Sequence, residues 1–263
     1  MLDQLHRTVA LPVFPPRRIV SVVPSQTELL HALGLGQEVV GITKFCVHPA
    51  EWFQTKPRIG GTKTLNLEKI AALEPDLIIG NKEENDREQI EWLSARFPVW
   101  MSDIYTLDDA VDMIGRVGEL CGRAAQAAVL CTQIREAFAR LDAEVQGRAP
   151  LRAAYYIWRK PFMAAGSKTF IQDMLRRAGF ENVFGHLERY PEVLRDDLKM
   201  ANPDIILLSS EPFPFSVKHV AEFQDICPSA RVEIVDGEMF SWYGNRLLLS
   251  ADYFVKLRQS WMR

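Results

Sequence analysis

The sequence lacks any stretch of about 18 uninterrupted apolar residues, and it therefore predicts no membrane-spanning helix. It also lacks a basic excess, since 31 lysines and arginines stand against 34 aspartates and glutamates, and we expect no nucleic-acid partner. The four cysteines form no Cys-x-x-Cys pair, which excludes zinc-ribbon and thioredoxin spacings. No cationic start followed by an apolar run of signal-peptide length is present, so the chain as written predicts a cytoplasmic protein if Met1 is its native start.

Motifs that would assemble a catalytic centre are missing as well. The five histidines show no His-x-x-x-His or His-Glu-x-x-His spacing, and there is no phosphate-binding glycine loop and no Gly-x-Ser-x-Gly elbow. We therefore expect no enzymatic activity, no catalytic residue, no covalent cofactor and no dedicated metal centre. His48, close to Cys46 in an expected loop, is kept only as a weak candidate for a metal ligand.

What the sequence does contain is an alternation of short apolar runs and helical patterns. The expected strands cover residues 18–23, 39–42, 77–79, 98–101, 153–158, 205–208 and 232–235. Strand–helix alternation is typical of parallel βαβ units. Residues 106–147 differ, because apolar residues keep a helical period there without an interrupting proline. This segment predicts one long helix, with two helices broken near Gly122 as the alternative.

Four parts follow from this pattern. We expect an N-terminal extension at residues 1–17, an N-terminal α/β lobe at 18–105, a linking helix at 106–147 and a C-terminal α/β lobe at 148–263. The fold class is α/β, with two Rossmann-like lobes, each with a parallel sheet, joined by a single long backbone helix. An internal repeat supports matching halves: Pro203 follows Pro75 at a spacing of 128 residues, and the same offset pairs Asp196 with Glu68.

The loops at the expected strand ends are unusually aromatic. They hold Phe162, Phe213, Phe215, Phe240, Trp242 and Tyr243. Ligands of open parallel sheets bind beyond the carboxyl ends of the strands, and two facing lobes would enclose a cleft there. Aromatic surfaces with a few polar groups suit a bulky, partly apolar ligand. The alternative is that these aromatics are ordinary core residues.

The segment Arg18 to Gly36 (RIVSVVPSQTELLHALGLG) resembles the opening motif of a known family. This family comprises the substrate-binding proteins with a helical backbone, which serve ABC importers of cobalamin, haem and iron–siderophore chelates. The ordered resemblance spans about residues 17–260 and continues through Val40–Thr43, Pro57–Gly61, Asn66–Glu68, Glu74–Ile78, Ala165–Ser167, Glu181–Phe184, Tyr190–Pro191 and Asn202–Asp204. The nearest likeness is to the cobalamin-binding branch.

The resemblance implies a periplasmic protein that captures a metal chelate between its lobes for an ABC importer. The chelate would be cobalamin or another corrinoid, or else haem or an iron–siderophore complex, and the protein would act as a monomer. The positions that the resemblance carries over as ligand-binding candidates are Ser25, Phe45, Thr62, Asn81, Phe162, Tyr190, Phe240 and Trp242. Tyr243 and Arg246, from the same strand-end loop as Trp242, complete the set of candidates. Glu68 and Asp196 correspond to the acids that dock on arginines of the permease. A cytosolic protein of the same fold that handles or processes a corrinoid or metal chelate is the alternative.

Overall fold

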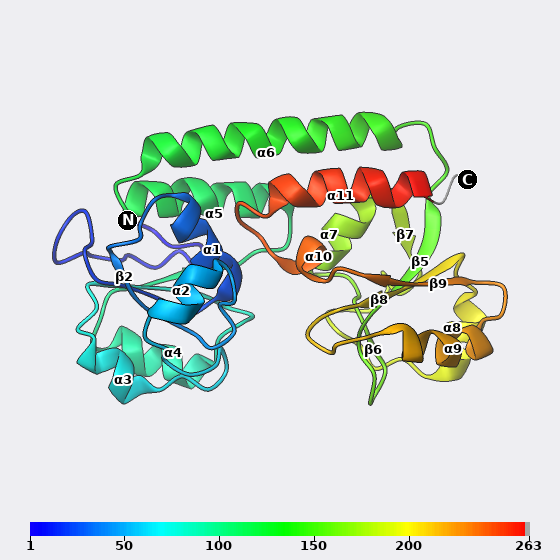
Figure 1. Ribbon diagram of the computed structural model, residues 1–263, viewed down its shortest axis with the longest axis horizontal. Helices are drawn as coiled ribbons and strands as arrows, with labels where there is room; N and C mark the ends of the chain where they lie inside the picture. Colours follow the sequence, from blue (N-terminus) through cyan, green and yellow to red (C-terminus); the bar gives the residue numbers. More distant parts are fainter. Residues whose placement is uncertain (261–263) are drawn as a thin grey trace. The chain divides into compact units, whose positions relative to one another are not determined.

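The chain folds into two compact units, seen in the computed structural model of residues 1–260 (Figure 1). The N-terminal unit comprises Met1–Ile104, Asp108–Ile134 and Trp242–Leu247, and the C-terminal unit comprises Tyr105–Leu107, Arg135–Ser241 and the residues from Leu248 on. The expected N-terminal extension, residues 1–17, is part of the N-terminal unit. Residues 261–263 of the expected C-terminal lobe lie outside the described residues.

The N-terminal unit is built on a four-stranded parallel sheet. Its strands have the spatial order β2-β1-β3-β4 and are β1 (Ile19–Ser21), β2 (Val39–Ile42), β3 (Leu77–Asn81) and β4 (Val99–Ser102). Every residue of β1, β3 and β4 is buried. A parallel sheet covered on both faces requires such continuous apolar runs, which is why the sequence shows them without alternation.

Five helices belong wholly or mainly to this unit. They are α1 (Pro24–Ala32), α2 (Ala50–Thr55), α3 (Leu67–Ala72), α4 (Arg87–Ser94) and α5 (Leu107–Leu120). The side chain of Asn66 accepts a hydrogen bond from the Lys69 amide at the start of α3, and Asp86 accepts one from the Gln89 amide at the start of α4. These caps satisfy amide groups that have no partner inside the helix, so they fix where each helix begins.

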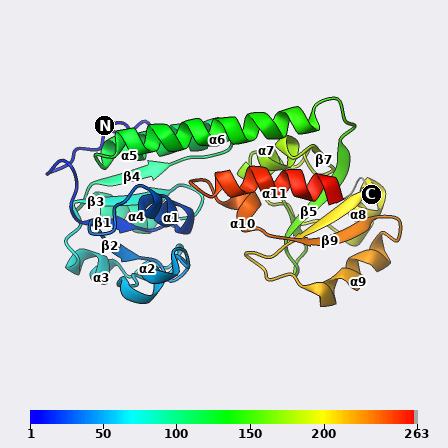
Figure 2. The ribbon, with the colours of Figure 1, turned by 45° about the horizontal axis from the view of Figure 1, so that its top comes forward.

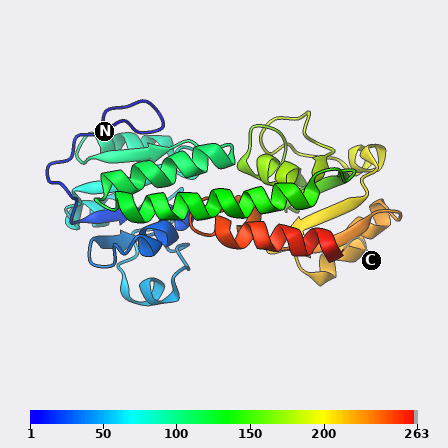
Figure 3. The same cartoon turned by 90° about the horizontal axis from the view of Figure 1, so that it is seen from above.

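Residues 106–147 form two helices and not one continuous helix, although the long α6 (Ala124–Val145) does join the two units. α5 ends at Leu120 and α6 begins three residues later, so the alternative with a break near Gly122 is confirmed. Gly122 has a φ of +68°, a left-handed conformation that ends α5. α5 and α6 lie side by side (Figure 2, Figure 3), and a methyl group at Gly118 would clash with Cβ of Ala127. The boundary between the two units falls inside α6, after Ile134.

The C-terminal unit has a five-stranded sheet. Its strands are β5 (Leu151–Trp158), β6 (Met163–Ala164), β7 (Phe180–Asn182), β8 (Ile205–Ser209) and β9 (Arg231–Val235). β5 pairs in parallel with β7 and β8, and β8 pairs in parallel with β9. Only the short β6 departs from the expected parallel arrangement, because it pairs with β5 as an antiparallel hairpin.

Helices cover this second sheet too. They are α7 (Phe170–Arg177), α8 (Arg195–Ala201), α9 (Val217–Ile226), α10 (Glu238–Ser241) and α11 (Leu247–Ser260), together with the second half of α6. The core of the unit contains a cluster of aromatic rings around Tyr156, which contacts Phe162, Phe184 and Phe223 at centroid distances of 4.9–6.3 Å. Among the described residues, no helix is both long and apolar enough to cross a membrane.

The internal repeat corresponds to the same local structure in both units. β3 begins at Leu77 and β8 at Ile205, which preserves the offset of 128 residues. Asp76 accepts hydrogen bonds from the backbone amides of Arg17 and Arg18, and Asp204 accepts one from the backbone amide of Arg152. The Arg18 and Arg152 side chains in turn donate to carbonyl groups at the ends of α3 and α8. Each unit therefore ties the end of one helix to the start of a strand in the same way.

Candidate ligand-binding site

The carboxyl ends of β1, β2 and β3 carry several of the predicted site residues in the N-terminal unit. Ser25 lies in the first turn of α1 directly after β1, and Phe45 lies in the loop after β2. Phe45 is 51% exposed, and the Lys44 ammonium group lies 5.0 Å from the centre of its ring. An exposed aromatic beside a cation offers both an apolar and a charged contact to a ligand, in the position where open parallel sheets bind their ligands.

Beneath these loops lies a buried network of polar side chains. The Asn81 amide nitrogen donates to the Ser102 hydroxyl at 2.9 Å, while its oxygen accepts from the amides of Glu83 and Glu84. The Gln26 side chain donates to the same Ser102 oxygen at 2.6 Å. Asn81 is 2% exposed, so the structure places this predicted ligand contact in the supporting network and not on an open surface.

Thr62 is joined to the same network through its backbone. Its carbonyl oxygen accepts a hydrogen bond from the Asn85 side chain at 3.1 Å, and that side chain also donates to the carbonyl of Val22. The side-chain oxygen of Asn85 accepts a hydrogen bond from the backbone amide of Asn81 at 2.8 Å. These bonds hold the loops after β1 and β3 in a fixed arrangement, and the Thr62 side chain remains half-buried beside them.

The segment Trp242–Leu247 brings three further predicted residues into the N-terminal unit. Arg246 forms a bidentate ion pair with Glu28 of α1, with distances of 2.9 Å from Nε and 2.8 Å from Nη2, and its guanidinium lies 4.8 Å from the Trp242 ring. The His48 ring meets Trp242 edge-on at 5.5 Å. Trp242, Tyr243 and Arg246 are 5–7% exposed, so they form the packed base of this region.

His48 is therefore placed against an aromatic ring. Within residues 1–260, no group of three or more His, Cys, Asp or Glu side chains is arranged to hold a metal ion. The neighbouring Cys46 is fully buried, and its sulfur accepts a hydrogen bond from the Thr27 hydroxyl at 3.0 Å. Burial raises the pKa of the Cys46 thiol, which makes it a poor nucleophile.

Phe162, Tyr190 and Phe240 lie in the C-terminal unit. Phe162 is half-buried against Phe223 at 4.9 Å, and Tyr190 is half-buried with the Arg189 guanidinium 5.7 Å from its ring. Phe240 is fully buried and packs on Tyr155, Tyr253 and Phe254. In this structure Phe240 is a core residue, as the alternative interpretation of the aromatic loops held.

Two aromatic residues of the expected strand-end loops, which were not among the predicted ligand-binding residues, are accessible in this unit. Trp158, the last residue of β5, is 39% exposed, and it contacts the half-buried Phe213 at 5.7 Å. The sequence places Phe213 among the loop aromatics, and it places Trp158 at the end of an expected strand where the next aromatic loop begins. Its position as the final strand residue, directly before a turn, was the available signal.

The two predicted docking acids occupy equivalent positions. Glu68 is the second residue of α3 and Asp196 the second residue of α8, and both are exposed. Two residues later each helix buries an apolar side chain, Ile70 or Leu198. Because residues two apart point to nearly opposite sides of a helix, each acid projects away from its own unit.

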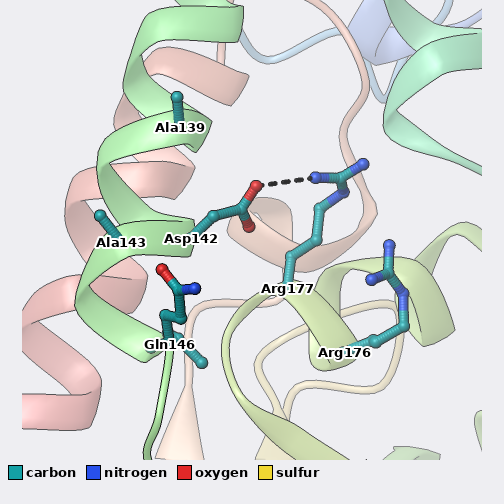
Figure 4. A pocket seen from close by; sticks show the side chains of 7 residues that line it. Ala139, Asp142, Ala143, Gln146, Arg176 and Arg177 are labelled. Carbon is teal, nitrogen blue, oxygen red and sulfur yellow. Dashed lines mark ion pairs between the residues drawn. The ribbon is translucent and has the colours of Figure 1, made fainter.

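A depression of about 580 Å³ in the C-terminal unit is lined by none of the predicted ligand-binding residues (Figure 4). It is formed by α6 and the end of α7, just before β7 begins, and its lining is Ala139, Asp142, Ala143, Val145, Gln146, Arg176 and Arg177.

Both arginines of this depression are already paired. Arg176 contacts Asp173 at 2.6 Å, and Arg177 contacts Asp173 at 3.1 Å and Asp142 at 3.6 Å. Burial alone would raise the pKa of Asp173, but hydrogen bonds from the Leu107 amide and from both arginines outweigh it and lower that pKa. The charges compensate one another, which favours a structural role for the cluster.

Comparison with known proteins agrees with this architecture. The chain is 27% identical to a vitamin B12-binding protein of Pectobacterium carotovorum over 240 residues, covering 90% of this chain and 86% of that protein. A vitamin B12-binding protein of Photorhabdus laumondii is 26% identical, with the same coverage.

Solved structures show the same fold. The periplasmic haem-binding protein of a Roseiflexus species, in its apo form, superposes with a TM-score of 0.83 at 22% identity, covering 93% of this chain and 98% of that one. The periplasmic vitamin B12-binding protein of Vibrio cholerae gives a TM-score of 0.80 at 23% identity, with the same two coverages. Residues 19–226, most of the sequence, match the family described as periplasmic binding protein, and the chain belongs to that family.

Proposed function

We propose that this protein captures a tetrapyrrole-type metal chelate, a corrinoid or haem, and delivers it to an ABC importer. The observation that carries the proposal is the match to vitamin B12-binding proteins along 90% of the chain. The exposed ring of Phe45 at a strand end, held above a rigid polar network, supports it. A ferric siderophore is also a metal chelate but has no tetrapyrrole ring, and it therefore serves as the contrasting ligand.

The first test is direct binding of named chelates to the full chain. Isothermal titration with cyanocobalamin, haemin and a ferric hydroxamate siderophore should show tight binding of at least one of the two tetrapyrroles. Chromatography of the recovered ligand should show it unaltered, whereas a modified ligand would favour a processing protein of the same fold. Absence of binding to both tetrapyrroles would refute the proposal, whether or not the siderophore binds.

Phe45 provides a variant that tests the location of the site. Phe45→Ala should weaken binding of that chelate about tenfold, because one well-placed aromatic contact contributes about 1–2 kcal/mol. Phe14→Ala is the matched control, since Phe14 is also an exposed phenylalanine of the N-terminal unit, at 65% exposure, and it lies outside the strand ends. Equal losses in both variants would contradict the proposed position.

We further propose that Glu68 and Asp196 dock the protein on arginines of the importer's permease. Both acids project from the second position of a short helix, and the side chain of Asp196 is 85% exposed. A carboxylate accepts both hydrogen bonds of a guanidinium, which suits a reversible contact. Asp196 pairs with Lys199 at 3.6 Å, a weak surface pair that a guanidinium would displace at little cost.

Charge reversal tests this contact separately from ligand capture. Glu68→Arg with Asp196→Arg should abolish association with a vitamin B12 importer reconstituted in nanodiscs, while the affinity for the chelate stays unchanged. Glu88→Arg with Asp252→Arg is the control, because both are exposed helical acids, one in each unit. If the two double variants associate equally well, the docking role is wrong.

The family also suggests where the protein acts. We propose that it works in the periplasm as a monomer, since one chain carries both docking acids. Cell fractionation would locate it, and light scattering coupled to gel filtration would give its mass. A cytoplasmic location or a stable dimer would contradict these two statements.

A further inference from the structure

Trp158 and Phe213 lie at the same edge of the C-terminal sheet. Trp158 is the last residue of β5, and Phe213 lies four residues beyond the end of β8, the strand that pairs with β5. The Phe213 amide donates a hydrogen bond to the carbonyl of Ile157 at 3.3 Å, which fixes the loop after β8 against the end of β5. The two rings meet edge to face, with centroids 5.7 Å apart and planes at 68°. We call this pair the Trp158–Phe213 ledge.

The accessible surface of this ledge is aromatic carbon. The indole N–H of Trp158 donates to the carbonyl of Lys160 at 3.1 Å, so its polar atom already has a partner. Trp158 is nevertheless 39% exposed, whereas Trp52, Trp100 and Trp242 are at most 7% exposed. An indole whose polar atom is satisfied gains nothing further from water, and covering its apolar face is favourable.

The ledge has a rigid backing. Phe213 packs against Phe215 at 4.8 Å and against His219 at 5.4 Å. Phe215 is 4% exposed and contacts Phe223 in the core of the unit. Ligand contact at the ledge would therefore immobilise few side chains, which keeps the entropic cost of binding low.

Its position distinguishes the ledge from other exposed apolar residues of this unit. Leu194, Met200 and Val217 are 64–81% exposed, but they lie on or directly before α8 and α9. Trp158 and Phe213 instead follow the carboxyl ends of two adjacent parallel strands, the place where open sheets present their ligand contacts.

We propose that the Trp158–Phe213 ledge contacts the conjugated ring system of a bound tetrapyrrole and sets the preference of the protein for flat macrocyclic chelates. This inference rests on the proposed function, and it names aromatic contacts that the resemblance did not carry over. A porphyrin ring is broad, flat and polarisable, and a corrin ring is equally broad although puckered. Either ring covers an aromatic pair more completely than a compact ferric chelate does. The exposed Lys160 in the following turn offers a cation to the propionate groups of a porphyrin such as haem.

The experiment measures the affinities of cyanocobalamin and haemin for the full-length protein by isothermal titration. Trp158→Ala should weaken binding of the preferred probe at least tenfold, and Trp158→Phe, which keeps an aromatic face, should stay within about threefold of the unchanged protein. Phe213→Ala should show a loss of similar size, with its melting temperature recorded because Phe213 also touches the core. Trp92→Ala is the matched control, since Trp92 is a half-buried tryptophan of α4.

The outcomes separate this inference from the proposed function. If the unchanged protein binds neither probe, the proposed function is refuted, and the role of the ledge is refuted together with it. If it binds a probe and Trp158→Ala binds that probe equally well, the ledge is refuted while the function stands. A tenfold loss in Trp158→Ala without a loss in Trp92→Ala supports the ledge, and an additional loss for haemin alone in Lys160→Ala would identify the acidic porphyrin as the preferred ring.

Discussion

Arg246→Ala should strongly destabilise the N-terminal unit, because it leaves a nearly buried carboxylate without its partner. The side chains of Arg246 and Glu28 are 8% and 14% exposed, and two hydrogen bonds of 2.8–2.9 Å join them. Removing one partner of a buried ion pair costs about 3 kcal/mol or more, since the remaining charge stays desolvated. Loss of the guanidinium contact with the Trp242 ring adds about 0.5–1 kcal/mol.

These two losses together, about 3.5–4 kcal/mol, should lower the melting temperature by about 7–16 °C, at about 2–4 °C per kcal/mol for a protein of this class. Differential scanning calorimetry measures it, and Arg87→Ala serves as the control, because Arg87 pairs with Glu91 while 90% exposed. That control should shift the melting temperature by less than about 2 °C, as an exposed pair four residues apart on a helix contributes about 0.3–0.5 kcal/mol. An Arg246→Ala shift as small as that of the control would refute the reasoning. Glu28→Leu combined with Arg246→Met should regain part of the loss, because neither charge is then left alone.

Three further predictions concern single side chains. Burial, together with Arg159 and Lys218, lowers the pKa of His219 below its usual 6.5, so the stability that the neutral ring contributes is present above pH 6.5 and is lost as the pH falls below it. The drop in melting temperature between pH 7.5 and 5.5 should therefore be smaller in His219→Gln than in the unchanged protein. An equal drop in both proteins would contradict this. Gly122→Ala should lower the melting temperature by about 2–4 °C, because alanine costs about 1 kcal/mol at a φ of +68°; an unchanged value would show that the turn can relax. All four cysteines are buried, and burial raises the pKa of Cys121 to about 12, so iodoacetamide at pH 8 should label the thiols in urea and leave them unlabelled in the folded protein, as counted by mass spectrometry.

The sheets were the most predictable part of the fold. Runs such as Leu77–Ile79 and Ile205–Leu208 are continuous and apolar because a parallel strand is buried on both faces, and the structure contains both strands. The break between α5 and α6 was harder to predict, because the apolar period continues on either side of it. The helix breaks where Gly122 adopts a left-handed conformation. The sequence does not reveal this conformation, because a glycine in a helical pattern can equally well be a point of close packing.

Within the candidate site, the sequence identified the loops better than the individual residues. Phe45 and Phe240 both follow strands and look alike in the sequence, yet one is 51% exposed and the other fully buried. The difference arises from partners distant in the sequence, since Tyr155 and Phe254 enclose Phe240. Asn81 was likewise selected by position, and its use inside a hydrogen-bonded network depends on Ser102, a residue of the neighbouring strand.

The assignment of Trp242–Leu247 to the N-terminal unit has a practical consequence for dissecting the protein. No single cut of the chain yields both units whole, because this hexapeptide is flanked on both sides by sequence of the other unit. A fragment ending at Ile134 would retain its entire sheet but would expose Glu28 without a counter-ion. We therefore expect this fragment to be only marginally soluble. Adding a synthetic peptide of residues 242–247 should restore its solubility only in part, because the free peptide binds at a far lower effective concentration than the same segment does within the intact chain.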